Sequence, residues 1–143
     1  MANQLQEQLP SEYLLSENEP YMNSRQLAYF RHKLLQWRAE LLSESDRTRE
    51  QMREEKLRET DLVDQGFSET ESAFELRTRD RYRKLIKKID AALERIEDGS
   101  YGFCEETGEE IGLKRLDARP IATLCVEAQE RHERIEKLQK IKG

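Results

Sequence analysis

Two runs of apolar residues, separated by a polar stretch, constrain the fold of this chain more than any other feature. Within each run the apolar residues follow one another at steps of 3, 4, 3 and 4, the spacing of coiled-coil contact positions. The first run consists of Leu27, Phe30, Leu34, Trp37 and Leu41. The second run consists of Tyr82, Leu85, Ile89, Ala92 and Ile96. Because each seam can pack on the other within one chain, the pattern predicts an antiparallel helical hairpin.

Local signals predict where this hairpin begins and ends. Asn23 and Gln26 form a capping-box pattern, in which the Asn side chain accepts a backbone N–H group and the Gln side chain reaches back. Gly99 follows the second seam, at a position suited to a left-handed residue that ends a helix. We therefore expect an N-terminal tail over residues 1–21 and the hairpin over residues 22–99.

The polar stretch between the seams predicts the tip of the hairpin. Gly66 interrupts the helical pattern, since glycine is unfavourable within a helix, and we place the tip at residues 61–66. Ser68 and Glu71 form a second capping-box pattern. The returning helix is therefore expected to begin just after Ser68.

The composition suits long helices with a narrow apolar seam and excludes a large spherical core. Hydrophobic residues make up 36% and charged residues 38% of the chain. The net charge of −5 argues against nucleic-acid binding, which needs a basic surface, and favours a protein partner. The N-terminal residues lack the basic and apolar regions of a signal peptide, and no segment approaches the roughly 20 apolar residues of a membrane span. With two cysteines, these features predict a cytoplasmic protein with free thiols.

The segment after the hairpin, residues 100–143, has the spacing of a zinc ribbon but only half of the ligands. The four positions of a C-x2-C-x17-C-x2-C motif hold Cys104, Thr107, Cys125 and Ala128. Structural zinc needs four Cys or His donors, which a hydroxyl and a methyl group do not supply. We therefore expect this segment to form a degenerate zinc knuckle (the knuckle) that binds neither zinc nor another metal.

Apolar packing must then replace the metal. The expected core of the knuckle consists of Phe103, Ile111, Leu113, Leu116, Ile121 and Leu124. Short extended pieces are expected near Tyr101–Phe103 and Ile111–Leu113, and a last helix is expected to start near Cys125. The predicted fold is mostly α: an antiparallel coiled-coil hairpin projecting from a small globular part, which carries the degenerate knuckle and a C-terminal helix.

Three segments of the chain resemble a known family. They are YMNSRQLAYF at the start of the first helix, ELRTRDRYRKLIKKID on the returning helix and YGFCEETGEEIGLKRLDARPIATLC over the knuckle. In these segments the chain resembles the DksA family, the secondary-channel regulators of bacterial RNA polymerase, over roughly residues 20–135. The resemblance implies a non-enzymatic transcription regulator, and the packing of the two seams on each other predicts that it works as a monomer. It is expected to enter the secondary channel and to alter open-complex stability at promoters together with the alarmone ppGpp, in the stringent response. Because two zinc ligands are missing, the chain resembles a zinc-independent branch of this family.

The resemblance also implies roles for individual residues. The family's tip motif, D-x-x-D-x-A, is matched by Asp61 and Asp64, with Gly66 in place of the alanine. The residues expected to contact the channel rim or ppGpp are Arg81, Lys84, Leu85, Lys88 and Arg119. A further basic position of the family holds Gln129 here, which removes one phosphate-binding charge and is expected to weaken ppGpp binding.

The same residues admit other interpretations. The acidic pair could belong to a transcript-cleavage factor that uses Mg²⁺ at the tip, or could be ordinary turn residues. The seams could mediate dimerisation in a helical adaptor. Arg119 could form an ion pair with Asp117 or a neighbouring glutamate, and Cys104 and Cys125 could form a reversible disulfide. His132, as a third metal donor, would still leave a zinc site one ligand short.

Overall fold

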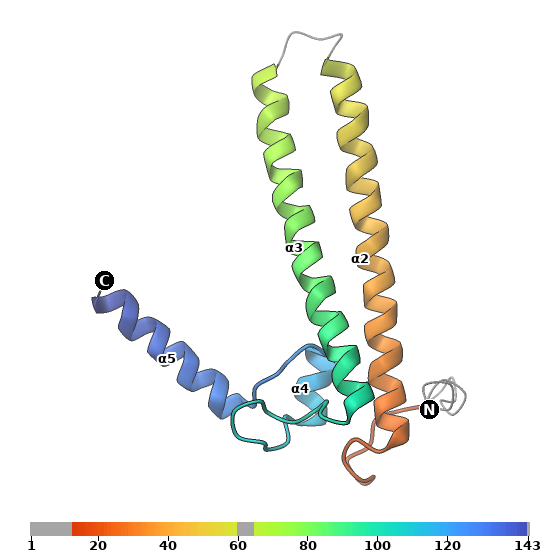
Figure 1. Ribbon diagram of the computed structural model, residues 1–143, viewed down its shortest axis with the longest axis vertical. Coiled ribbons are helices and arrows are strands. Elements are labelled where there is room, and N and C mark those ends of the chain that lie inside the picture. Colours follow the sequence, from red (N-terminus) through yellow and green to blue (C-terminus); the bar gives the residue numbers. More distant parts are fainter. Residues whose placement is uncertain (1–12, 60–64, 143) are drawn as a thin grey trace. The chain divides into compact units, whose positions relative to one another are not determined.

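A computed structural model describes residues 13–59 and 65–142, which are mainly helical. The helices within these ranges are α2 (Ser24–Glu59), α3 (Gln65–Asp98), α4 (Leu113–Ala118) and α5 (Val126–Lys142) (Figure 1). One isolated antiparallel β-bridge joins Phe103 and Glu110. Among the described residues, no helix is long and apolar enough to cross a membrane.

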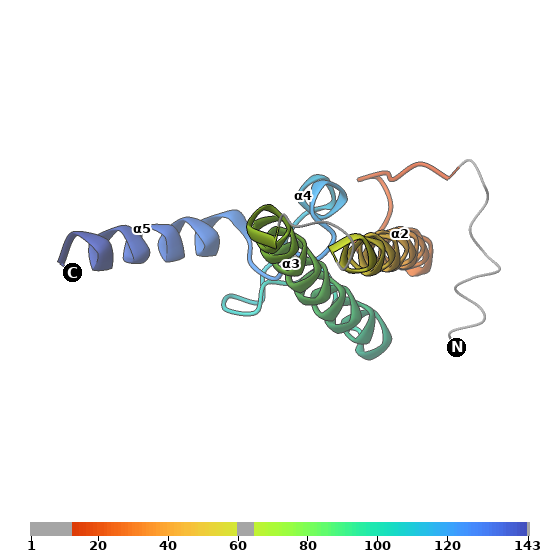
Figure 2. The ribbon, with the colours of Figure 1, turned by 90° about the horizontal axis from the view of Figure 1, so that it is seen from above.

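The chain divides into two compact units. The hairpin unit comprises Leu35–Asp90, and the knuckle unit comprises Met1–Leu34 together with Ala91–Gly143. Helices α2 and α3 each contribute to both units. Within each unit their segments lie side by side and run in opposite directions (Figures 1 and 2).

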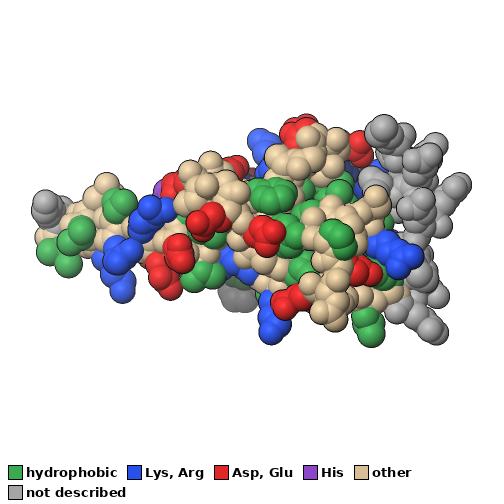
Figure 3. All heavy atoms as spheres, turned by 90° about the horizontal axis from the view of Figure 1, so that it is seen from below, with side chains coloured by type: hydrophobic (Ala, Val, Ile, Leu, Met, Phe, Trp, Pro, Cys, Tyr) green, Lys and Arg blue, Asp and Glu red, His purple; other side chains and the backbone are tan. Residues whose placement is uncertain are grey.

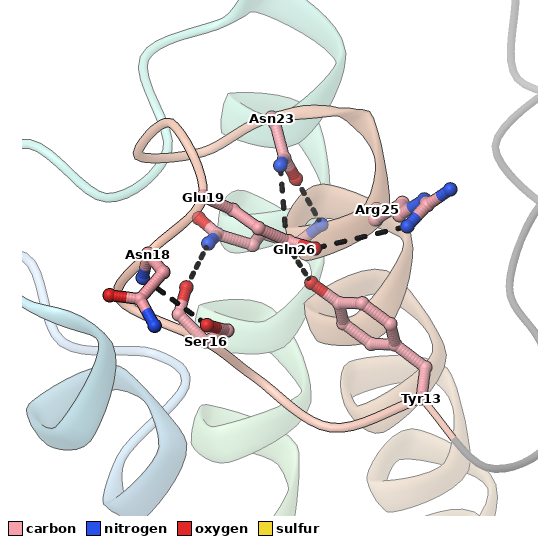
Figure 4. A network of polar contacts seen from close by, with 7 residues as sticks. All are labelled: Tyr13, Ser16, Asn18, Glu19, Asn23, Arg25 and Gln26. Carbon is pink, nitrogen blue, oxygen red and sulfur yellow. Dashed lines mark hydrogen bonds and ion pairs between the residues drawn. The ribbon is translucent and has the colours of Figure 1, made fainter.

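The start of α2 is held by the predicted cap. The Asn23 side-chain oxygen accepts the Gln26 backbone N–H at 2.9 Å. Gln26 reaches back as expected, but its side-chain oxygen accepts the N–H of Met22 at 2.7 Å. Its amide nitrogen donates to the Ser16 carbonyl at 3.1 Å, so this fully buried side chain ties the preceding segment to the first turn of α2 (Figure 4). The predicted helix start is confirmed.

The start of α3 differs from the prediction. The helix begins at Gln65, so Gly66 lies within its first turn and Ser68 is not a cap. Intrinsic propensity is a weak guide at a single position, and one glycine, at about 1 kcal/mol relative to alanine, does not prevent the helix here. The other end agrees with the prediction, since α3 ends at Asp98 and Gly99 follows with φ +84°.

The predicted seams form the core of the hairpin unit. Leu41 and Ile89 are buried there. Trp37, Tyr82 and Leu85 are half-buried. Between the helices, the Arg38 guanidinium donates to the Asp90 carboxylate at 2.8 Å. The predicted antiparallel coiled-coil hairpin is confirmed.

The other seam residues lie in the knuckle unit, where all but the half-buried Leu27 belong to the core. Phe30 and Leu34 of α2 and Ala92 of α3 are fully or almost fully buried. The Phe30 ring lies 5.5 Å from the ring of Tyr101, which follows α3 and is itself 1% exposed. An aromatic pair of this kind stabilises a core beyond the area that it buries.

The expected apolar core of the knuckle is confirmed for four of its six residues. Ile111, Leu113, Leu116 and Ile121 are buried, and Leu124 is half-buried. The prediction is wrong for Phe103, which is 37% exposed. Consecutive residues of an extended segment point to opposite sides. Cys104 is buried, whereas Phe103 lies on the other side, where its ring packs edge-on against Tyr21 at 5.5 Å and stays partly exposed.

Helix α4 was not expected from the sequence. Leu113 begins this helix instead of ending an extended piece, so that part of the prediction is wrong. Six residues are too few to show a helical period or to form a stable helix alone. Burial of Leu113 and Leu116 stabilises α4 through tertiary packing.

Candidate functional site: a two-cysteine knuckle and a basic helix face

The four positions of the zinc motif come together in the knuckle unit. Cys104, Cys125 and Ala128 are buried. The Thr107 hydroxyl lies 3.8 Å from the Cys125 sulfur and also accepts the Glu109 N–H at 3.2 Å. The fourth position, Ala128, lies in the first turn of α5. This helix starts at Val126, next to the predicted start at Cys125.

Backbone hydrogen bonds give the knuckle the shape of a small hairpin. The Cys104 N–H donates to the Glu109 carbonyl at 2.8 Å, and the Gly108 N–H donates back to the Cys104 carbonyl at 2.9 Å. A second link joins the Ile111 N–H to the Gly102 carbonyl at 2.8 Å. These bonds join backbone atoms and use none of the four side chains of the motif.

The surroundings of Cys104 favour its thiolate. Burial of the thiol opposes ionisation, but the Thr107 side chain and the backbone N–H groups of Cys125, Thr107 and Glu106 donate to the sulfur. Together these hydrogen bonds lower the pKa of Cys104 to about 6. Both cysteines are free thiols in this structure.

These residues do not fit a zinc ion. The two thiols are the available donors of the motif, since Thr107 offers a neutral hydroxyl and Ala128 offers a methyl group. His132 bonds to the Glu106 carboxylate, which Arg131 also approaches at 3.8 Å. No group of three or more His, Cys, Asp or Glu side chains suited to a metal occurs in the part of the chain that the structure describes.

A tyrosine from the N-terminal segment ties the two sides of the knuckle together. The Tyr21 hydroxyl donates to the Gly102 carbonyl at 2.7 Å and accepts the Gly112 N–H at 2.9 Å. The Met22 side chain packs so closely that a Cβ on Gly102 would lie 2.8 Å from its Cγ. The sequence analysis missed Tyr21, and the signal that could have found it is an aromatic residue in an otherwise polar segment.

Tyr101 fixes the segment that follows α4. Its buried hydroxyl donates to the Pro120 carbonyl at 2.8 Å. Burial raises the pKa of this hydroxyl far above its usual range, so it remains a donor. Sequence reasoning missed this residue as well, because nothing local indicates a partner 19 residues away.

Arg119 lies directly after α4, in the extended conformation expected for a residue before proline. Its side chain is exposed and makes no ion pair with any residue that the structure describes. The alternative pairing with Asp117 is wrong. Asp117 accepts hydrogen bonds from Lys33 at 2.6 Å and from the Tyr29 hydroxyl at 2.7 Å.

The other predicted contact residues lie in the hairpin unit. Arg81, Lys84 and Lys88 are exposed and Leu85 is half-buried. Their spacing places them along one face of α3. Gly66 lies in the first turn of the same helix. Asp61 and Asp64 lie outside the described residues.

Comparison with known families covers both parts of the chain. Residues 26–96 match the family described as the N-terminal domain of the DnaK suppressor protein DksA. Residues 99–134 match the prokaryotic dksA/traR C4-type zinc finger. The chain belongs to the DksA family.

Relatives in the DksA family share most of the chain. The RNA polymerase-binding transcription factor DksA of Caulobacter vibrioides is 62% identical over 128 residues, which cover 90% of each chain. The Escherichia coli K12 protein of the same name is 48% identical over 117 residues, which cover 82% of this chain and 78% of that protein. The solved structure of transcription factor DksA2 from Pseudomonas aeruginosa is 43% identical and superposes with a TM-score of 0.78, covering 84% of this chain and 95% of that one. These names agree with the prediction of a regulator that is not an enzyme.

The knuckle of this chain differs from the zinc finger of its family in its metal-binding residues. The matched zinc finger is of C4 type, whereas this member has two cysteines at the four positions. The backbone hydrogen bonds and the Tyr21 tie are what hold the same segment here.

Proposed function

We propose that this protein is a transcription factor that binds RNA polymerase. The observation that carries the proposal is the 62% identity, over 90% of both chains, to a relative named as an RNA polymerase-binding transcription factor. The antiparallel hairpin supports it, because the resemblance implies a hairpin that enters the secondary channel. A polymerase partner also implies that the protein works in the cytoplasm.

The tip of the hairpin is proposed to act near the polymerase active centre and to alter the stability of promoter open complexes. Helix α2 ends at Glu59 and α3 begins at Gln65. The resemblance assigns Asp61 and Asp64 to this tip. Gly66 completes the proposed tip.

The basic face of α3 and Arg119 are proposed to contact the channel rim and ppGpp. Arg81, Lys84 and Lys88 carry charge, are exposed and share one helix face with Leu85. Guanidinium and ammonium groups of this kind bind phosphate. Gln129 supplies no charge and donates to Glu133 within α5 at 3.3 Å, which supports a weaker response to ppGpp.

The protein is proposed to work as a monomer without zinc and without sequence-specific nucleic-acid binding. Six of the ten seam residues are buried within the chain and the other four are half-buried, which supports packing of the seams on each other within one chain. The face shown in Figure 3 mixes acidic, basic and hydrophobic side chains. With a net charge of −5, such a surface does not suit the phosphate backbone.

The decisive experiment combines binding and transcription. The purified full-length protein should be retained by immobilised core RNA polymerase and should repress a ribosomal promoter in vitro, more strongly when ppGpp is present. Mg²⁺-dependent cleavage of backtracked RNA without promoter repression would instead support the transcript-cleavage function. Failure to bind core polymerase would refute the proposal.

A further inference from the structure

Arg119 combines a fixed backbone with a free charged side chain. Its N–H donates to the Arg115 carbonyl at 2.9 Å, and its carbonyl accepts the Ala122 N–H at 3.0 Å. The next residue, Pro120, is buried and is held through its carbonyl by Tyr101. The backbone of Arg119 is thus fixed in the knuckle unit, while no described residue pairs with its exposed guanidinium.

The acid nearest to Arg119 along the chain is already occupied. Lys33 of α2 donates to both the carboxylate and the backbone carbonyl of Asp117, each at 2.6 Å. Tyr29, one turn earlier, donates to the same carboxylate oxygen at 2.7 Å. The Lys33 ammonium also lies 5.8 Å from the centre of the Tyr29 ring, within the range of a cation–π contact.

The electrostatics of this cluster agree with its geometry. The hydrogen bonds from Lys33 and then Tyr29 hold the pKa of Asp117 below its usual range, despite its partial burial. Burial and the bond to Asp117 raise the pKa of Tyr29 to about 12. At neutral pH the carboxylate is therefore charged and the phenol is a donor, so the cluster is fully formed.

We infer that Lys33 and Tyr29 are positioning residues for Arg119, because by holding Asp117 they keep the guanidinium free for a phosphate-bearing ligand. The inference rests on the proposed function, in which that ligand is ppGpp. If Lys33 is removed, the Asp117 carboxylate loses its cationic partner and becomes available to Arg119, two residues away. An ion pair formed there competes with phosphate for the same guanidinium.

The first measurement uses the isolated protein and needs neither polymerase nor ppGpp. Phenylglyoxal modifies free guanidinium groups, and peptide mass spectrometry gives the modification rate of Arg119. Lys33→Met should slow this rate about two- to fivefold, the range expected for a partly exposed ion pair. Tyr29→Phe, a milder change, should slow it less.

The double variant Lys33→Met/Asp117→Asn separates positioning from simple support of the fold. Asparagine keeps an oxygen for the Tyr29 hydroxyl but carries no charge, so the modification rate of Arg119 should return to the wild-type value. The matched control is Arg38→Met, which breaks the Arg38–Asp90 pair of comparable exposure in the hairpin unit. That variant should leave the rate at Arg119 unchanged.

The second measurement is the ppGpp response of promoter repression with the same variants. It should fall in Lys33→Met and recover in the double variant. An unchanged rate at Arg119 in both Lys33→Met and Tyr29→Phe would overturn the inference, as would a double variant as slow as Lys33→Met. If the wild type shows no ppGpp response while the modification rates follow the expected order, ppGpp is the wrong ligand and the positioning of Arg119 stands.

Discussion

The hairpin unit takes its structure from two regular helices, whereas the knuckle unit depends on hydrogen bonds between residues far apart in the sequence. In the hairpin unit, a repeated apolar seam and the Arg38–Asp90 pair join α2 to α3. In the knuckle unit, Tyr21 bonds to a carbonyl 81 residues away and Tyr29 to a carboxylate 88 residues away. Packing of a repeated apolar seam stabilises the hairpin unit, and hydrogen bonds from individual side chains stabilise the knuckle unit.

This difference suggests how a family member can lose a metal without losing the knuckle. In small zinc-dependent domains the metal supplies much of the folding free energy. Here buried apolar residues, backbone hydrogen bonds and the Tyr21 hydroxyl act on the same segment. Changes in the knuckle should therefore alter stability, and changes at the tip should alter function.

The largest effect on function is expected for Asp64→Asn. The protein should fold and bind core polymerase normally but lose roughly tenfold or more of its promoter repression, equivalent to about 1.4 kcal/mol. Asp61→Asn should behave similarly but more mildly. In vitro transcription at matched polymerase occupancy measures this effect. Full repression by Asp64→Asn would show that the tip does not carry the function.

In the knuckle unit, Gly102→Ala should be the most destabilising change. Gly102 has φ +93°, and a Cβ there would lie 2.8 Å from Met22 Cγ. Backbone strain of about 1–2 kcal/mol and overpacking of about 1–3 kcal/mol should add. Gly108→Ala is the matched control, since φ is +74° there but no atom lies within 4 Å of the added Cβ. Equal losses in urea unfolding would show that the Met22 contact is unimportant.

Tyr21→Phe should lower the free energy of unfolding by about 1–3 kcal/mol, because the Gly102 carbonyl and the Gly112 N–H lose their shared partner. Tyr13→Phe serves as the control, since its hydroxyl bonds to Glu19 instead of the knuckle. Hydrogen exchange at Ile111 and Gly112 should quicken only in the Tyr21 variant. Identical exchange in the two variants would contradict the proposed tie.

Arg38→Met tests the hairpin unit and should cost at most about 1 kcal/mol, since the Arg38–Asp90 pair is partly exposed. The thermal unfolding midpoint should drop slightly, and the drop should vanish at high salt, where screening weakens the pair. A loss as large as that of Tyr21→Phe would mean that polar side chains matter equally in both units.

The smallest effect is expected on adding a chelator. The protein should purify without stoichiometric zinc, because Thr107 and Ala128 supply no ligand. A chelator should therefore leave the thermal unfolding midpoint unchanged. About one zinc per chain by elemental analysis, or a lower midpoint with chelator, would refute the metal-free knuckle.

The regular part of the molecule was predictable because its signals are local. The 3,4 spacing of the apolar residues and the Asn23–Gln26 cap predicted the hairpin and the start of α2, and the structure confirms both. Gly99 marked the end of α3 for the same reason. At Gly66 the local signal failed, since a glycine in the first turn of a long helix does not interrupt it.

The two long helices and the two missing zinc ligands could be predicted, because both depend only on the identity and spacing of residues. Other features depend on contacts between distant parts of the chain. Helix α4 exists because Leu113 and Leu116 become buried, and Phe103 stays partly exposed beside Tyr21 while Cys104 is buried. Asp117 is paired with Lys33 and Tyr29 instead of Arg119. Those partners lie more than 80 residues away in sequence, and folding alone brings them within hydrogen-bonding distance.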